Sequence, residues 1–223
     1  MATALYVPSA PRSLALSLGV ESITLSYAVP AETGLGNSSR AVTGYEVFVS
    51  APCTPPAARV VSGGVFAVTF AGLEKGCTFT FKIRSTNEAG SSNFSTEVSD
   101  TAYGEASAPR GLSVLAGTAQ QVVVAWALPL DTGDGLPNGA LVLYYLVEVA
   151  PDAEFTSLLR SVQTSELEAV VEGLTPWVAV HCRVRGVTRL GLGQPKTPNS
   201  YTYTTPYTLH PTLKTLKAQI LIL

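Results

Sequence analysis

The chain has 223 residues and a formal net charge of −2, with 46% hydrophobic and 13% charged residues. This balance lacks the basic excess of a nucleic-acid-binding protein, and its apolar fraction is too high for a disordered chain. The length allows one large domain or two domains of about 100 residues each.

The N-terminal stretch MATALYVPSAPR has no basic segment followed by a long apolar segment, so it does not read as a signal peptide. The longest apolar runs, QVVVAWALPL and GALVLYYLVEVA, are far shorter than the ~20 residues of a membrane-spanning helix. Their content of Val, Tyr and Trp predicts strands instead. A link to a membrane is therefore expected only through chain outside this sequence.

Turn-forming clusters of Gly, Pro, Ser and Asn recur about every 8 to 12 residues. Short β-branched and aromatic runs lie between them, a pattern typical of an all-β sandwich or barrel. The clearest predicted strand, at 78–84, alternates Phe79, Phe81 and Ile83 with polar residues. Only the C-terminal stretch LHPTLKTLKAQILIL shows helical spacing of its apolar residues.

The second half of the chain repeats the first. The offset between matched residues drifts from 98 (109 − 11) to 101 (191 − 90), as small loop insertions would produce. The sequence therefore predicts two similar domains instead of one large core. The matched pairs include Pro11 with Pro109, Tyr27 with Trp126, Tyr45 with Tyr145, Leu73 with Leu174, and Gly90 with Gly191.

With these positions aligned, both halves resemble fibronectin type III modules. Members of that family place a Trp on the second strand and a Tyr on the third, then a Leu, a turn, a strand that starts with Tyr, and an Asn-x-x-Gly turn. The first half matches at Pro11, Tyr27, Tyr45, Leu73, Gly76, Phe79, Phe81, Ile83, Asn87 and Gly90. The second half matches at Pro109, Trp126, Tyr145, Leu174, Pro176, Val180, Cys182, Val184 and Gly191.

The resemblance implies an all-β fold of two tandem immunoglobulin-like β-sandwiches with about seven strands each. It places the first module at 8–103 and the second at 108–206, joined by the short linker AYGEASA. The tail at 207–223 has no place in either sandwich and is expected to be poorly ordered or a short added element.

Two positions depart from the family pattern. Phe79 and Val180 stand where the family has a Tyr whose hydroxyl bonds to nearby backbone, so we expect this corner to be held by packing alone. Val180 and Cys182 are also small for a sandwich core, and Trp126, Trp177 and the YYL run at 144–146 are candidates to fill the space.

The resemblance also bears on the three cysteines. In this fold the turn with Cys53 and the turn with Cys77 lie at the same end of the sandwich, so a disulfide between them is a candidate. The alternative is two free thiols on turns. Cys182 points inward in the alternation and is expected to be a small buried apolar residue.

Other residues are candidates for modification or binding. Asn37 and Asn93 fit the Asn-x-Ser/Thr pattern of N-glycosylation in predicted loops, with unmodified asparagines as the alternative. His181, Arg183 and Arg185 fall on one face of a predicted strand and form a candidate binding face, with an ordinary solvated sheet face as the alternative.

No residue pattern predicts catalysis, a cofactor or a metal site. His181 and His210 have no Cys, Asp or Glu cluster at ligand spacing, and no nucleophile motif occurs. The glycine-rich pieces do not join a strand to a helix, as a phosphate-binding turn must. Asp131 and Asp134 fall in a loop without the further carboxylate that a calcium site needs.

The predicted function is that of a non-catalytic protein-interaction or adhesion module pair, from a larger extracellular or cell-surface multidomain protein. Its partner would be a protein or a glycan, bound by loops or sheet edges on a rigid scaffold. The alternatives are a structural spacer in a modular array and an accessory module of a secreted enzyme. A cytoplasmic location is the alternative if Met1 is a true start.

Overall fold

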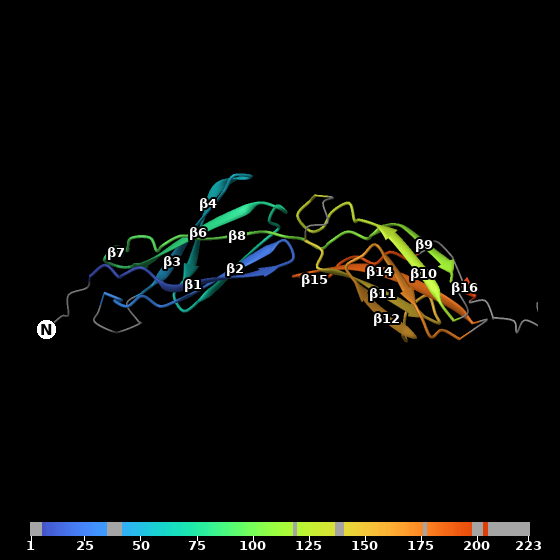
Figure 1. Ribbon diagram of the computed structural model, residues 1–223. Helices are drawn as coiled ribbons and strands as arrows, with labels where there is room; N and C mark the ends of the chain where they lie inside the picture. Colours follow the sequence, from blue (N-terminus) through green and yellow to red (C-terminus); the bar gives the residue numbers. More distant parts are fainter. Residues whose placement is uncertain are drawn as a thin grey trace, which may run out of the picture. The chain divides into compact units, whose positions relative to one another are not determined.

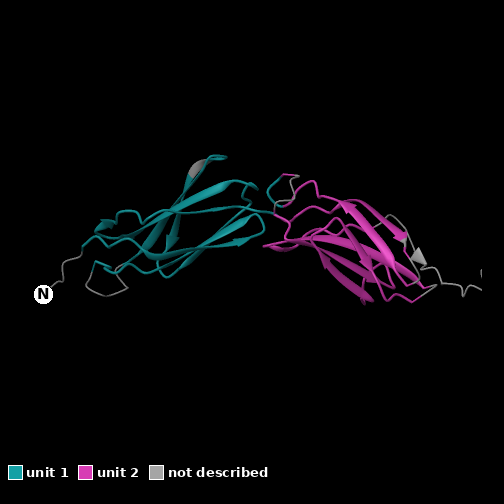
Figure 2. Cartoon of the chain, viewed as in Figure 1, with its two compact units in different colours: residues 1–104, 133–135 teal, residues 105–132, 136–223 magenta. Residues whose placement is uncertain are grey.

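The chain folds into strands throughout the part that can be described. The computed structural model describes residues 6–34, 42–117, 120–136, 141–175, 178–197 and 203–204. These ranges contain sixteen strands and no helix, which confirms the all-β fold. The chain divides into two compact units, residues 1–104 with 133–135 and residues 105–132 with 136–223 (Figure 2). The expectations for Asn37, Trp177, His210 and the tail at 207–223 concern residues outside the described ranges.

Unit 1 consists of two antiparallel sheets (Figure 1). The smaller sheet has the order β1-β2-β5, formed by β1 (Arg12–Gly19), β2 (Ser22–Ala28) and β5 (Ala67–Ala71). The larger sheet has the order β4-β3-β6-β7, and β8 also pairs with β6. Its strands are β3 (Gly44–Ala51), β4 (Thr54–Ser62), β6 (Thr78–Asn87), β7 (Gly90–Ser91) and β8 (Val98–Thr101).

The core of unit 1 follows from the alternation of side chains along its strands. On β6, Phe79, Phe81 and Ile83 are 2%, 0% and 0% exposed, whereas the residues between them are partly exposed. They belong to one buried cluster with inward residues of β2 and β3, so both sheets contribute to it. This confirms the inward set expected from the sequence, because alternate residues of a strand face the same side.

Unit 2 repeats this topology. Its smaller sheet has the order β13-β10-β9, formed by β9 (Arg110–Ala116), β10 (Val122–Ala127) and β13 (Glu168–Val171). Its larger sheet has the order β12-β11-β14-β15, and β16 also pairs with β14. These strands are β11 (Tyr144–Ala150), β12 (Arg160–Thr164), β14 (Ala179–Thr188), β15 (Gly191–Leu192) and β16 (Tyr203–Thr204).

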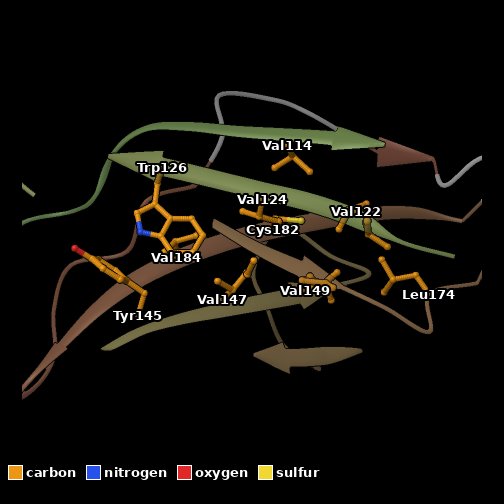
Figure 3. Close-up of a cluster of buried hydrophobic side chains, with 13 residues drawn as sticks. Val114, Val122, Val124, Trp126, Tyr145, Val147, Val149, Leu174, Cys182 and Val184 are labelled. Carbon is orange, nitrogen blue, oxygen red and sulfur yellow. The ribbon is translucent and has the colours of Figure 1, made fainter. Parts of the chain in front are cut away.

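Trp126 fills the core of unit 2, where several inward residues are small. Val180 and Cys182 on β14 are both buried. Trp126 on β10 extends toward Tyr145 on β11, on the opposite sheet, with ring centroids 5.3 Å apart (Figure 3). An edge-on aromatic pair of this kind contributes about 0.5–1.5 kcal/mol beyond the burial of its area.

The corner that precedes β6 in unit 1, and β14 in unit 2, is held by backbone hydrogen bonds and not by packing alone. The N–H of Leu73 donates to the carbonyl of Glu21 at 3.0 Å, and the N–H of Leu174 donates to that of Gln120 at 3.0 Å. Both acceptor residues have positive φ, 47° for Glu21 and 71° for Gln120. Each unit therefore has a hydrogen bond at this corner without the hydroxyl of the family tyrosine.

We expect Phe81→Ala to lower the free energy of unfolding of unit 1 by about 3–5 kcal/mol, because it removes a fully buried ring and leaves a cavity. Thr80→Ala is the matched control: its outward hydroxyl bonds only to exposed Ser99, and its loss should change stability by less than about 1 kcal/mol. Chemical denaturation followed by circular dichroism measures both variants. Equal, small losses would contradict the sandwich core.

Candidate interaction surfaces

The described residues contain no cluster that suggests metal-based chemistry. Within these ranges no group of three His, Cys, Asp or Glu side chains could hold a metal ion. Nor does this part of the chain contain a helix of sufficient length and apolar character to cross a bilayer. The surfaces that remain are a disulfide-bonded turn, two outward sheet faces and a groove.

Cys53 and Cys77 form a disulfide in unit 1, with their Cα atoms 6.3 Å apart. Cys53 lies in the turn between β3 and β4, and Cys77 lies directly before β6. The bond closes a loop with a sequence separation of 24, which stabilises the unit by about 3 kcal/mol if chain entropy in the unfolded state is the dominant contribution. It also holds one end of β4 near the start of β6.

Cys182 is a free cysteine inside unit 2 and is 1% exposed. Burial raises the pKa of its thiol to about 12, because the charged thiolate loses its hydration there. The thiolate is the reactive form of cysteine, so this side chain is a packing residue and a poor nucleophile.

The three residues of the predicted basic face, His181, Arg183 and Arg185, lie in one outward row of β14 and are half-buried. Arg183 donates twice to the carboxylate of Glu148 on β11, at 2.6 Å and 3.1 Å. Its guanidinium also lies over the ring of Phe155, 4.2 Å from the ring centroid.

Arg185 shares the same carboxylate, with its Nε 3.9 Å from Glu148. The two guanidinium groups thus face one acidic group, which neutralises part of the charge of the predicted face. Sequence reasoning missed Glu148, because it lies on the neighbouring strand, 35 residues before Arg183.

The matching sheet of unit 1 has an outward face of similar chemistry. Lys82 pairs with Glu97 at 3.1 Å, and Arg84 pairs with Glu46 on β3. The ring of Phe94 lies 5.4 Å from Lys82 Nζ and 4.9 Å from Arg84 Cζ. In each unit, therefore, one outward arginine of this sheet, Arg84 or Arg183, is paired with a carboxylate and covered by an aromatic ring.

Asn93 lies in the loop between β7 and β8, and its side chain is exposed. Ser95, the third residue of the pattern, accepts a hydrogen bond from the N–H of Ile83 at 3.1 Å. An oligosaccharide on Asn93 would extend from an accessible loop, so glycosylation stays a prediction for this site. Asn37 lies outside the described residues.

A groove of about 380 Å³ opens in unit 1 between β4 and β5. Each of these strands pairs with only one other described strand, β4 with β3 and β5 with β2, so both are edge strands of their sheets. Val49, Phe70 and Phe79 supply apolar lining, and Ala57 of β4 lies at one wall. This volume falls in the range of ligand pockets, about 300–1,000 Å³.

Arg59 of β4 reaches across this groove to β5. It donates to the carbonyl of Thr69 at 2.9 Å, and its guanidinium lies 5.7 Å from the centroid of Phe70. In unit 2, Arg160 of β12 makes the related contacts, because it donates to the carbonyls of Glu172 and Gly173 at 3.2 Å and 2.7 Å. The groove was not predicted, since the separation of two edge strands leaves no local pattern in the sequence.

Residues 107–202 match the family model of the fibronectin type III domain. Over 197 residues, 84% of this chain, the sequence is 27% identical to protein sidekick-1 of Mus musculus, of whose length the chain spans only 9%. The fold is similar to that of the chicken CNTN1 FN1–FN3 domains, with a TM-score of 0.56 and 19% identity over 90% of this chain and 69% of that one. A two-domain fibronectin type III segment of chicken tenascin matches 88% of this chain and 100% of its own length, at 16% identity and a TM-score of 0.40.

Thiol counting tests the arrangement of the cysteines. In buffer without reductant we expect no thiol to react in the folded protein, one to react after denaturation, and three after denaturation with reduction. The native thiol should stay unreactive at pH 8, because its pKa is raised to about 12. Three reactive thiols in the denatured, unreduced protein would show that Cys53 and Cys77 are not bonded.

The ion pair of Arg183 with Glu148 and the more exposed pair of Arg84 with Glu46 should contribute differently to the free energy of unfolding. Glu148→Ala should lower the free energy of unfolding of unit 2 by about 3 kcal/mol, because it leaves two poorly solvated guanidinium groups without their carboxylate. Glu46→Ala in unit 1 should lower it by about 1 kcal/mol or less, because that pair is more exposed. Chemical denaturation of both variants measures the difference, and equal losses would contradict this reasoning.

Proposed function

We propose that the chain is a non-catalytic protein-interaction unit of a larger extracellular or cell-surface protein, since residues 107–202 match the fibronectin type III model and the fold is similar to that of tandem domains of this kind. The observation that carries the proposal is the groove of unit 1 between β4 and β5. It combines an apolar lining with the unpaired backbone edge of β4, while on the facing edge of β5 the carbonyl of Thr69 accepts from Arg59. A free strand edge beside an apolar pocket is what an extended peptide uses for binding.

The groove suits a segment of a protein partner. An added strand can pair its backbone with a free edge, while a large apolar side chain enters a pocket beside it. The lining of Val49, Phe70 and Phe79 would hold such a side chain. A glycan suits this site less well, because the groove offers one guanidinium, that of Arg59, and a mainly apolar surface.

The disulfide supports an extracellular location. Disulfides persist in oxidising compartments and are rare in the cytosol. The bond between Cys53 and Cys77 also lies next to the groove, since Thr54 and Glu74 line it. Loss of the bond would free one end of β4, so the proposed binding depends on the oxidised state.

The proposal of a non-catalytic role has its own support among the described residues. The thiol of Cys182 is buried and its pKa is raised to about 12. Acid–base or nucleophilic chemistry needs groups within hydrogen-bond reach of a shared open site. The groove instead presents apolar side chains with Arg59 and Glu74 at its margins.

The test is a binding measurement with the full chain. The immobilised protein is screened against purified ectodomains of cell-surface proteins and, in parallel, against a glycan array. We expect a saturable protein partner whose affinity falls by about tenfold or more with Ala57→Gln, because the longer polar side chain occupies the groove.

Val60→Gln is the matched control, because Val60 also lies on β4 but is 80% exposed and does not line the groove. It should leave the affinity within about twofold of the native value. A partner that both substitutions weaken equally, or binding to glycans alone, would overturn the proposal. So would the lack of saturable binding, which would favour a structural spacer.

A further inference from the structure

The loop between β7 and β8 is tied to the larger sheet of unit 1 on both sides of one exposed residue, Asn93. Before it, the N–H of Ser92 donates to the carbonyl of Ser85 at 2.9 Å. After it, the N–H of Ser95 donates to the carbonyl of Ile83 at 2.8 Å, and the hydroxyl of Ser95 accepts from the N–H of Ile83 at 3.1 Å. The backbone around Asn93 is therefore held against β6.

The side chain of Asn93 has no such role. Its amide makes no hydrogen bond to the residues that the structure describes, although its backbone carbonyl accepts from the hydroxyl of Ser92 at 2.7 Å. The next side chain is engaged, because the ring of Phe94 lies 6.3 Å from that of Phe48 on the outward face of the sheet. Asn93 is thus an exposed, unengaged side chain on a loop whose neighbouring residues are fixed.

Asn87 shows, in the same unit, an asparagine that the fold does use. It is 8% exposed, and its side-chain amide donates to the carbonyl of Tyr6 at 2.7 Å. Its Oδ1 accepts from the N–H groups of Ala89 and Gly90 at 2.9 Å and 3.2 Å. Asn87 lacks the Asn-x-Ser/Thr pattern, since residue 89 is Ala, whereas Asn93 begins Asn-Phe-Ser. The asparagine that carries the acceptor pattern is therefore the one that the fold does not need.

The repeat shows that this edge forms without an acceptor asparagine. At the offset of 101 (194 − 93), the residue aligned with Asn93 is Gln194, and Lys196 stands where unit 1 has the serine of the pattern. The backbone is nevertheless paired as in unit 1, because the N–H of Lys196 donates to the carbonyl of Val184 at 2.8 Å. The Asn-Phe-Ser pattern is therefore a feature of unit 1 that backbone pairing does not explain.

Asn93 lies at the edge of its sheet that is opposite to the groove. The order β4-β3-β6-β7 places β4 at one edge and β7 at the other, and β8 pairs with β6 on the same side as β7. Edge strands invite pairing with other chains unless they are covered. A bulky hydrophilic group on Asn93 would cover the β7–β8 edge and leave the groove beside β4 open.

We propose that Asn93 carries an N-linked glycan, which covers the β7–β8 edge of unit 1 and leaves the groove open. The proposal rests on the extracellular location proposed above, because the secretory pathway both forms disulfides and attaches N-linked glycans. In the transfer, the amide nitrogen of Asn93 forms a bond to the anomeric carbon of the sugar and loses a proton. The bond between that carbon and the pyrophosphate of a lipid-linked oligosaccharide breaks, and the lipid pyrophosphate leaves with the electron pair, so no atom is oxidised or reduced.

The hydroxyl of Ser95 belongs to the acceptor pattern but is bonded to β6 in the folded unit. The transfer therefore takes place before this segment pairs with β6. The folded unit then needs only to accommodate the glycan, which the exposed position of Asn93 allows.

Peptide mapping of the full chain, secreted from cultured animal cells behind an added leader, tests the modification. Peptide N-glycosidase in heavy-oxygen water converts a glycosylated Asn to a labelled Asp, so mass spectrometry reports Asn37 and Asn93 separately. We expect the label at residue 93 and its loss with Asn93→Gln. Ser95→Thr is the matched control and should keep the label, because threonine preserves the acceptor pattern. An unlabelled residue 93 in the secreted protein would overturn the proposal, whereas binding in the groove would be unaffected by that result.

Hydrogen–deuterium exchange before and after enzymatic removal of the glycan tests where it lies. Removal should speed exchange of amides at 92–101 by about twofold or more and leave those of β4 (Thr54–Ser62) unchanged. Asn93→Gln, which never carries the glycan, should match the deglycosylated protein in both segments and in its denaturation midpoint. Unchanged exchange at 92–101, or a response in β4 instead, would overturn the proposed position. Neither measurement needs a binding partner, so both can be read even if the proposed function fails.

Discussion

Both units depend on one constraint: every second side chain of the central strands, β2, β3 and β6 in unit 1 and β10, β11 and β14 in unit 2, must enter a core shared by two sheets. A shift by a single residue would turn the whole apolar set toward water, so the pairing register is strongly specified. Ile83 and Val184 illustrate this, since both are 0% exposed and lie 101 residues apart. Loops can change length between such positions, which is why the repeat drifts while its inward residues stay in phase.

The same constraint leaves the outward residues free to differ. Thr24 and Thr69 share a hydrogen bond through their hydroxyls, with Ser17 opposite Thr24 on β1, whereas the residues at the same row of unit 2, Leu115, Val123 and Val170, are apolar. Neither choice disturbs the core behind it, because these side chains project from the other face of the sheet. Differences of function between the two units are therefore to be sought on outward rows and strand edges.

The inward set, the duplication and the all-β fold could be read from the sequence because each is encoded by local spacing. The contacts of Arg183 could not, because they join β14 to a carboxylate on β11 and to a ring in a loop. The corner hydrogen bonds could not be read from the sequence either. Their acceptor residues, Glu21 and Gln120, adopt a positive φ, which is uncommon for residues other than glycine. The groove depends on the separation of two edge strands that do not pair with each other.

The outward apolar row of unit 2, formed by Leu115, Val123 and Val170, could by contrast be found from the sequence alone. Aligning the repeat places Leu115, Val123 and Val170 against three hydroxyl residues, and this contrast is the signal. A single exposed Leu would not indicate a distinct surface, because apolar atoms contribute much of any protein surface. Here the strand register makes the three side chains adjacent, and unit 1 folds in the same way with a polar row. The apolar row of unit 2 is therefore a surface difference between two units whose cores are built alike, because unit 1 folds without it.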